Sequence, residues 1–425
     1  MGTSLFFVQL FLESKNPINL IITFTLRNIQ KIKNLTDQKK ENIYTLQFWL
    51  LCTSSLLFFT SFNMIIPELP DYLTSLGGGD YKGLIIALFT LTAGLSRPFS
   101  GKLTDRVGRV PVMVVGVVVS CVCTLFYPIV GTVAGFLLLR FFHGFSTGFK
   151  PTGTSAFLAD IVPANRRGEA MGILGFCSST GIGVGPILGS WLTMETDINT
   201  MFYCSSAVSL LSILILSGMK ETLEHPEKLK LEHFRIRKNE IIDVNALPPA
   251  IVMLLCTTSY GVILTLIPDL SKSLGIENKG MFFMFFTGAS MLVRVLAGKL
   301  SDKYGRLPVL KLSTILLVIS LCWVGVASSA FELYAAAILL GLGIGTNSPT
   351  IYAWTIDRSN SLHRGRAIAT MYIALEIGIG MGAFLSGLLY DNVDERIGWA
   401  FMASGFACFC AFLYVMFAPL KERSA

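Results

Sequence analysis

Long apolar runs alternate with short polar loops along most of the chain. An apolar run of about 20 residues is long enough to cross a membrane as an α-helix, because each helical residue rises about 1.5 Å and the hydrocarbon core is about 30 Å thick. One longer polar segment, Lys220–Pro249, divides the runs into two sets of six. The predicted membrane helices lie near residues 47–67, 82–101, 111–131, 133–159, 168–191, 199–218, 247–267, 279–298, 308–328, 330–356, 366–389 and 398–418.

A short charged loop occurs twice, as GKLTDRVGR at Gly101–Arg109 and as GKLSDKYGR at Gly298–Arg306, 197 positions later. The same offset relates Asp160 to Asp357 and continues through five predicted helices. Chance does not maintain one offset over that length, so the sequence predicts two copies of a six-helix unit. The expected segments are an N-terminal tail at 1–46, an N-terminal bundle at 47–219, a linker at 220–246, a C-terminal bundle at 247–419 and a tail at 420–425.

The composition agrees with a chain that lies mostly in lipid. Of its 425 residues, 52% are hydrophobic and 14% are charged, and the mean hydropathy is +0.63. A soluble protein carries about 25% charged residues, so the composition excludes a soluble globular class. The nine cysteines all lie in apolar runs without disulfide or zinc spacing, and we interpret them as small packing residues.

The basic residues predict an orientation in the membrane. If the loop at Gly101–Arg109 is cytoplasmic, the inner loops and the C-terminal tail hold twenty Lys and Arg residues, whereas the outer loops hold four. Such a bias places both termini on the cytoplasmic side of an inner or plasma membrane. The net charge of +7 therefore reflects orientation and gives no support to nucleic-acid binding. The apolar stretches in residues 1–46 are too short to span, and we expect a cytoplasmic tail that lies on the membrane, is disordered or reflects an early start codon.

Two related halves suggest a mechanical function. Parallel halves can rock against each other about a central site and open it to either side of the membrane in turn. The sequence contains no nucleotide-binding P-loop, no zinc-peptidase motif, no serine nucleophile elbow and no carboxylate cluster suited to a metal. We therefore expect a transporter and not an enzyme, with no cofactor and no metal, acting as a monomer.

The repeated loop resembles the signature that the major facilitator superfamily carries between helices 2 and 3. LLRFFHGFSTG, at Leu138–Gly148, resembles the helix 4 pattern of that family, and GFCSSTGIGVGPILG, at Gly175–Gly189, resembles its helix 5 antiporter motif. The likeness covers residues 47–418 and is most similar to the twelve-helix drug and metabolite efflux branch. The resemblance implies an all-α membrane fold of twelve helices in two pseudo-symmetric bundles, working by alternating access.

On this resemblance the two charged loops are expected to form conformational latches. Asp105 would face the start of helix 11 near His363–Ala367, and Asp302 would face the start of helix 5 near Arg166–Glu169, where a helix dipole favours a carboxylate. These latches would close the cytoplasmic side and favour an outward-open state. The alternative is that the loop charges only set the orientation.

The arginines of the loops are expected to pair with acids at the inner ends of helices 4 and 10. Arg106 or Arg109 would pair with Asp160, and Arg306 would pair with Asp357. The candidate latch residues are Gly101, Asp105, Arg106, Gly108, Arg109, Asp160, Gly298, Asp302, Gly305, Arg306 and Asp357.

Glycines at close spacing in helices 4, 5, 10 and 11 predict tight helix contacts, because small residues let helices approach closely in lipid. For helix 5 the expected neighbours are helices 1 and 8, and Pro186 is expected to bend it. The resemblance adds control of leak or of antiport direction. The residues are Gly144, Gly148, Gly181, Gly183, Gly185, Pro186, Gly341, Gly345, Gly378, Gly380 and Gly382.

Ionisable residues inside predicted helices are candidates for the transport site, because buried charges are costly in lipid and usually face a cavity. We expect Glu376 to be the proton or cation site, with permanent pairing to a basic neighbour as the alternative. Lys150 and Arg140 would contact an anionic or zwitterionic group, or else pair internally, for example with Glu376. His143 would relay protons or simply pack.

Arg97 and Arg294 occupy equivalent positions four residues before the two loops. We interpret both as anchors at the inner membrane surface. The leading hypothesis is a secondary transporter that exports a small organic molecule such as a drug or metabolite, coupled to protons. The alternatives are an importer or facilitator of a sugar or organic anion and, from another class, a membrane receptor or scaffold that does not transport.

Overall fold

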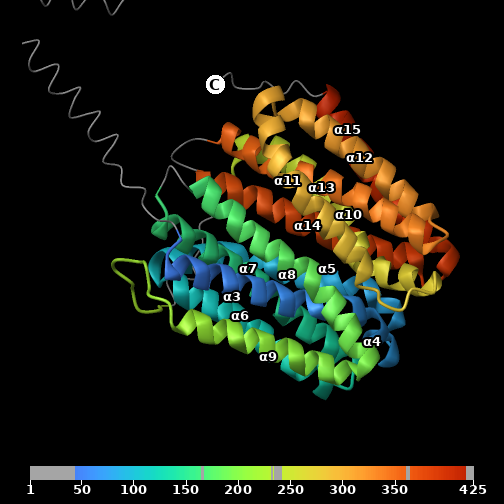
Figure 1. Cartoon of the computed structure of the whole chain (residues 1–425), viewed down its shortest axis with the longest axis horizontal. Coiled ribbons are helices and arrows are strands. Elements are labelled where there is room, and N and C mark those ends of the chain that lie inside the picture. The colour runs from blue at the N-terminus through green and yellow to red at the C-terminus, as the bar shows by residue number, and fades with distance from the viewer. Residues whose placement is uncertain (1–43, 164–166, 231–232, 234–241, 360–363, 418–425) are drawn as a thin grey trace, which may run out of the picture. The chain divides into compact units, whose positions relative to one another are not determined.

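The structure is a computed structural model that describes residues 44–163, 167–230, 233, 242–359 and 364–417, with the side chains of 167–169, 295, 298–299, 302 and 364–366 left out. All regular secondary structure in these residues is helical (Figure 1). The α-helices are α3 (Leu46–Met64), α4 (Leu69–Ser75), α5 (Lys82–Arg106), α6 (Arg109–Phe126), α7 (Val133–Ile161), α8 (Arg167–Glu195), α9 (Ile198–Ser217), α10 (Leu247–Ser273), α11 (Met281–Tyr304), α12 (Arg306–Val326), α13 (Ala330–Arg358), α14 (Arg364–Tyr390) and α15 (Ile397–Phe417). Short 3₁₀ turns lie at Ile66–Glu68, Gly79–Tyr81, Tyr127–Ile129, Val244–Ala246 and Asp394–Arg396.

Each predicted membrane helix corresponds to one long helix of the structure. Within the described residues, ten helical segments are long and apolar enough to cross a membrane, the first of them running from Leu46 to Ser75 through α3 and α4. The two remaining helices of the twelve predicted ones are α7 and α11. Helix α7 has 29 residues, which include the charged Arg140 and Lys150, and the described apolar part of α11 is Met281–Arg294. Several helices extend past the predicted ends into the charged loops, as α5 does to Arg106.

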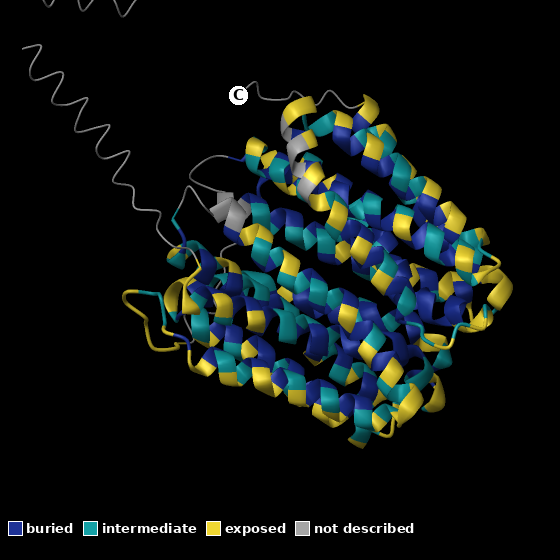
Figure 2. Cartoon of the chain, viewed as in Figure 1, coloured by how far each residue is buried: buried dark blue, intermediate teal, exposed yellow. Residues whose placement is uncertain are grey.

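The helices form two groups that follow the order of the chain. Helices α3 to α9 pack against one another, and α10 to α15 do the same (Figure 1). Across the boundary, α5 packs on α14 and α8 packs on α11. Figure 2 shows buried residues turned toward the helix contacts and many exposed residues on the outer surfaces. Large apolar side chains such as Leu292, Phe331 and Trp399 lie among the exposed ones, as expected for a surface that faces lipid.

The sequence repeat is visible in the backbone. Gly108 and Gly305, at equivalent positions of the two charged loops, have φ angles of +141° and +89°. Gly77 and Gly275, which follow α4 and α10, have φ angles of +86° and +70° and are also repeat equivalents. A side chain at such angles is strained, so both halves use glycine to make the same turns between helices.

The glycines expected at close helix contacts lie where a neighbouring backbone leaves no room for a Cβ. Within each half, glycines of α7 lie against the backbone of α5, and glycines of α8 lie against α3. In the same way, glycines of α13 lie against α11, and glycines of α14 lie against α10. The glycines at these contacts are Gly144, Gly148, Gly181, Gly185, Gly341, Gly345, Gly378 and Gly382.

Two further glycines, Gly183 and Gly380, face the opposite half. Gly183 of α8 lies against Thr287 of α11, and Gly380 of α14 lies against Thr90 of α5. The two glycines are repeat equivalents, and so are the two threonines, so one contact is built twice across the boundary. Helix α8 continues through Pro186, whose backbone lies directly against Gly280 at the start of α11.

The first part of the linker, described at residues 220–230 and 233, lies against the first charged loop. The carboxylate of Glu221 accepts hydrogen bonds of 3.0 Å from the backbone N–H groups of Arg109 and Val110, the first residues of α6. Glu227 forms a 3.0 Å ion pair with Arg106. Hydrogen bonds from His233 and Arg106 hold the pKa of the Glu227 carboxyl below its usual range. This part of the linker is therefore attached to the N-terminal half, whereas Asp243 and Asn245 near its end bond to Thr370 and Arg358 of the C-terminal half.

Candidate functional site

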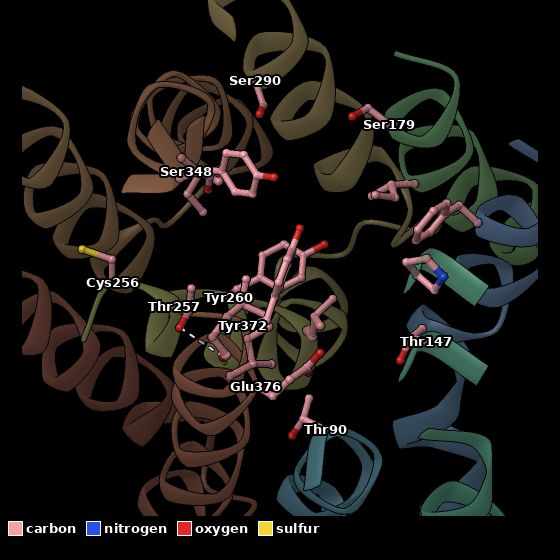
Figure 3. Close-up of a pocket in the computed structure, with 18 of the residues that line it drawn as sticks. Thr90, Thr147, Ser179, Cys256, Thr257, Tyr260, Ser290, Ser348, Tyr372 and Glu376 are labelled. Atoms are coloured by element: carbon pink, nitrogen blue, oxygen red, sulfur yellow. Dashed lines mark hydrogen bonds between the residues drawn. The ribbon is translucent and has the colours of Figure 1, made fainter. Parts of the chain in front are cut away.

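A cavity of about 700 Å³ lies between the two halves. Its walls come from α3, α5, α7 and α8 on one side and from α10, α11, α12, α13 and α14 on the other. Figure 3 shows Tyr260, Tyr372 and Glu376 gathered on one wall, with Thr147 across from them and Ser179 and Ser290 on a third side. Most of the lining is apolar or aromatic, which suits an organic molecule with a few fixed polar contacts. The aromatic residues are Phe59, Phe62, Phe89, Tyr260, Phe286, Tyr352 and Tyr372.

Three charged residues line the cavity among those that the structure describes: Arg97, Arg294 and Glu376. Arg97 on α5 donates to Glu376 on α14 with a distance of 2.6 Å between Nη2 and Oε1, and its Nε lies 3.2 Å from the same oxygen. The guanidinium also lies 4.6 Å from the ring centre of Tyr372. Glu376 was expected to be the proton or cation site, with pairing to a basic neighbour as the alternative, and the structure shows such a pair, so the coupling role stays a prediction. Arg97 was expected to be only an inner anchor. The structure corrects this interpretation, because Arg97 lines the cavity and joins the two halves.

Arg294 repeats this arrangement without the acid. It extends from α11 toward α8, where its Nη1 lies 3.5 Å from the hydroxyl of Ser179. Arg294 is the repeat equivalent of Arg97, and Ser179 is the repeat equivalent of Glu376. The interpretation of Arg294 as an anchor is therefore corrected as well, because this residue also lines the cavity and reaches the other half. Periodicity did not reveal the role of these arginines, because it does not show which face of a helix meets a cavity.

Arg140 and His143 lie inside the N-terminal half and do not line the cavity. The fully buried Arg140 donates from Nε to the carbonyl of Ile85 at 3.0 Å and lies 4.8 Å from the ring centre of Phe89. His143 contacts Ser120 Oγ at 3.1 Å through Nε2 and the hydroxyl of Tyr127 at 3.2 Å through Nδ1. These contacts match the packing alternative for His143 and an internal role for Arg140.

Lys150 is also enclosed within the N-terminal half. Its ammonium group donates to Ser55 Oγ at 2.8 Å and to Thr154 Oγ1 at 3.0 Å, and the side chain is 1% exposed. It does not reach Glu376, so the expected alternative of a pair between these two residues is wrong. Glu376 pairs with Arg97 because α5, and not α7, packs on α14.

The charged loops hold the expected arginine–acid pairs. Arg109 Nε lies 2.9 Å from Asp160 Oδ2, and Arg306 Nε lies 2.8 Å from Asp357 Oδ2. Each pair stays within its own half. Asp105 lies 3.8 Å from Arg109 and its side chain is 76% exposed. The predictions for Gly298, for the side chain of Asp302 and for most of the two helix starts expected to receive the acids lie outside what the structure describes.

The opposite end of the molecule carries a second set of ion pairs, which join the halves. Lys82 Nζ lies 2.6 Å from Asp269 Oδ1, with side chains 8% and 7% exposed. Lys279 Nζ lies 2.7 Å from Asp71 Oδ2 and 3.1 Å from Glu68 Oε2. Lys82 and Lys279 are repeat equivalents, as are Asp71 and Asp269, so the pairs cross the boundary symmetrically.

Lys279 remains charged despite partial burial. Burial opposes the ammonium charge, but the carboxylates of Glu68 and Asp71 outweigh that cost and raise the pKa of Lys279 above its usual value. The sequence contained a signal for this end of the molecule, since Pro70-Asp71 recurs as Pro268-Asp269 and Lys82-Gly83 recurs as Lys279-Gly280. The crossed pairing was not predicted from it, because the partners depend on how the halves pack.

Comparison with known proteins identifies the relatives of the chain. The family model described as Major Facilitator Superfamily matches residues 51–247 and 249–425. The multi-drug resistance efflux pump PmrA of Streptococcus pneumoniae is 29% identical over 308 residues, which cover 69% of this chain and 76% of PmrA. Multidrug resistance protein 2 of Bacillus subtilis is 24% identical over 391 residues, covering 89% and 96%. The crystal structure of a D-xylose–proton symporter shares the fold with a TM-score of 0.73 at 16% identity, covering 88% of this chain and 97% of that one.

Proposed function

Because the chain belongs to the Major Facilitator Superfamily and is a multi-span membrane transporter of that family, we propose that it exports a small organic molecule in exchange for protons by alternating access. The observation that carries the proposal is the cavity between two repeat-related halves, in which the ion pair of Arg97 and Glu376 joins one half to the other. A molecule in this cavity contacts both halves, so binding and proton exchange there can bias their relative movement.

The moving units of the proposal are residues 47–219 and 247–419, with both termini on the cytoplasmic side. In this structure the lysine–acid pairs of Lys82 and Lys279 tie the halves together at the outer end. The cavity lining extends toward the charged loops and includes Gly101, Ser155 and Ala369. These features support an inward-facing state, in which the outer end is closed and the inner end is accessible.

The charged loops are proposed to act in the outward-facing state. There Asp105 and Asp302 would meet the starts of α14 and α8 and close the inner end. The exposure of Asp105 in the present structure supports this role, because the carboxylate is available for a partner that the closed inner end would supply. The pairs of Arg109 with Asp160 and of Arg306 with Asp357 hold each loop on its own half.

Proton coupling is proposed to act through Glu376. When Glu376 is ionised it holds Arg97, and when it is protonated it loses the charge that binds the guanidinium. Removing one charge of a buried pair leaves the other uncompensated, which is costly. Protonation would therefore weaken the link between α5 and α14 and make movement of the halves easier.

The direction of transport is proposed from the relatives, whose names describe multidrug efflux pumps. The similarity to a sugar–proton symporter concerns the fold, so an importer has weaker support. A scaffold that does not transport has no evident use for a cavity with an ion pair between its halves.

Uptake into everted membrane vesicles with an acidic interior tests the proposal. The probes are ethidium, 2-naphthoate and 2-naphthamide, which are cationic, anionic and neutral. The chain should accumulate at least one probe above vesicles that lack it, and collapse of the proton gradient should abolish accumulation. Glu376→Gln should still exchange labelled for unlabelled probe but should not accumulate it. If Glu376→Gln accumulates the probe as well as the wild type does, the coupling role is wrong, and if the wild type accumulates none, the proposed export is wrong.

A further inference from the structure

The cavity carries an unbalanced positive charge. Arg97 and Glu376 neutralise each other at 2.6 Å. Arg294 is the remaining charged residue among the described residues that line the cavity. The described residues place no carboxylate within ion-pair distance of it, and its hydrogen bond is to Ser179 at 3.5 Å. The cavity therefore holds one net positive charge where a molecule would bind.

The repeat shows that this imbalance comes from a single position. Arg97 and Arg294 are equivalent, and each reaches across the boundary to the equivalent residue of the other half, 376 or 179. In one direction the arginine meets a glutamate, and in the other it meets a serine. Both halves thus place an arginine opposite the same position of the other half. Opposite Arg294, however, this position carries the small hydroxyl group of a serine in place of a neutralising acid, which leaves space beside the guanidinium.

An unneutralised guanidinium within a membrane span is costly, so it favours a partner with negative charge. Arginine binds carboxylate, sulfonate and phosphate oxygens through two parallel N–H donors, which makes it selective for such groups. Arg294 is exposed to the cavity and is therefore accessible to a bound molecule. Ser179 adds a hydroxyl donor at the same place.

The surroundings of Arg294 indicate the rest of the molecule. Tyr260, Phe286 and Tyr372 contribute aromatic surface to the same cavity. A volume of about 700 Å³ accommodates a compact organic molecule. Resting on the function proposed above, we propose that Arg294 and Ser179 bind the anionic group of the transported molecule, and that the substrates are organic anions with an aromatic or aliphatic body.

Binding of labelled 2-naphthoate to the purified full-length chain in detergent at pH 7.5 tests this inference. Unlabelled naphthalene-2-sulfonate, decanoate and the neutral isostere 2-naphthamide serve as competitors. The wild type should bind 2-naphthoate, the two other anions should displace it, and the amide should compete about tenfold less well, because it lacks the charge-assisted hydrogen bonds.

Two variants remove the proposed interaction by different means. Arg294→Gln removes the charge, and Ser179→Glu supplies the missing acid, reproducing opposite Arg294 the pair that Glu376 makes with Arg97. Both should weaken 2-naphthoate binding by about tenfold to a hundredfold, with Arg294→Lys in between. Arg396→Gln, which removes an exposed arginine outside the cavity, should bind as the wild type does. Because Ser179→Glu introduces a pair already present in the fold, its effect does not depend on whether Arg294→Gln folds well.

The inference is overturned if the amide competes as well as the anions, if Arg294→Gln and Ser179→Glu bind with wild-type affinity, or if none of the three anions binds at roughly millimolar concentration. The assay needs neither a membrane nor a proton gradient. Wild-type binding without gradient-driven accumulation in vesicles would therefore contradict the proposed export and leave the anion site standing.

Discussion

At the scale of single residues, one difference between the repeats determines the chemistry of the cavity. Position 376 carries a glutamate and its equivalent, 179, carries a serine, while both facing positions carry arginine. One arginine is consequently tied to the opposite half and the other is exposed to the cavity. The pseudo-symmetric scaffold thus holds two different arginine sites, for which we propose proton coupling at Arg97 and Glu376 and anion binding at Arg294 and Ser179.

We predict that Arg97 and Glu376 are energetically coupled. Arg97→Gln leaves the carboxylate without its cation, and Glu376→Gln leaves the guanidinium without its anion, so each change alone should be destabilising. The double variant removes both charges and should be more stable than the sum of the single effects predicts, by about 1–3 kcal/mol. Thermal unfolding of the four proteins in detergent measures this coupling. Strictly additive effects would show that the pair contributes nothing.

Lys150 provides the contrasting case. Because Lys150 is enclosed by Ser55 and Thr154 within one half, we predict that it serves the packing of that half and not the transported molecule. Lys150→Met should lower the thermal midpoint or leave it similar, while the KM for transport and its dependence on the proton gradient stay at wild-type values. A severalfold change in KM without loss of folded protein would show that Lys150 does take part in binding the transported molecule.

At the scale of elements, lysine–acid pairs join the two halves at the end of the molecule that we propose to be the outer one, and each pair connects a residue of one repeat to a residue of the other. The lysine at the start of α5 meets the acid near the end of α10, and the lysine before α11 meets the acid of α4. Because the pKa of Lys279 is raised, the stability that its ammonium charge contributes is fully present below the ordinary value of 10.5 and is lost as the pH rises through the raised pKa. Burial opposes the charge of its partner Asp71, but the lysine keeps the pKa of that carboxyl below the usual range, so the carboxylate also stays ionised near neutral pH. Closure of the outer end by this pair should therefore not change across physiological pH.

A charge exchange tests the outer pairs. Lys82→Asp places a second acid beside Asp269, and the repulsion between the two carboxylates should open the outer end and slow transport severalfold. Combining Lys82→Asp with Asp269→Lys restores opposite charges in reversed order and should recover much of the rate. Transport in vesicles measures the rate, and the alkylation rate of a cysteine introduced at the outer end measures how far that end is open. If the combined variant is as slow as Lys82→Asp alone, the pair does not act by its charge.

The linker also stabilises an element, because its residue Glu221 caps the N-terminus of α6. Glu221 accepts hydrogen bonds from the first two backbone N–H groups of α6, which have no partners within the helix, and its negative charge interacts favourably with the positive end of the helix dipole. We predict that Glu221→Ala lowers the free energy of unfolding by about 1 kcal/mol. The control is Glu224→Ala, an exposed carboxylate three residues further on. An equal effect of the two changes in thermal unfolding would exclude a specific capping role.

At the scale of the whole molecule, apolar runs and the internal repeat were sufficient to predict the helices, their division into two bundles and the superfamily, and the comparisons confirm the resemblance to its efflux branch. The same patterns did not predict which buried charges meet. Arg140 and Lys150 were predicted to face the cavity because buried charges are costly in lipid, yet both turn into the N-terminal bundle. Arg97 and Arg294 were interpreted as anchors at the inner membrane surface, but both reach across the boundary between the halves.

The central claim is that the two halves move so that one end closes as the other opens. Spin labels on a chain with its nine cysteines replaced can measure this, with one pair at the exposed outer positions Ser75 and Ser273 and another at the inner positions Val115 and Leu312. Pulsed dipolar spectroscopy should resolve two populations in which the outer distance lengthens while the inner distance shortens, and Glu376→Gln should shift their proportions. Distances that stay single and unchanged by Glu376→Gln, or that lengthen together at both ends, would contradict the account.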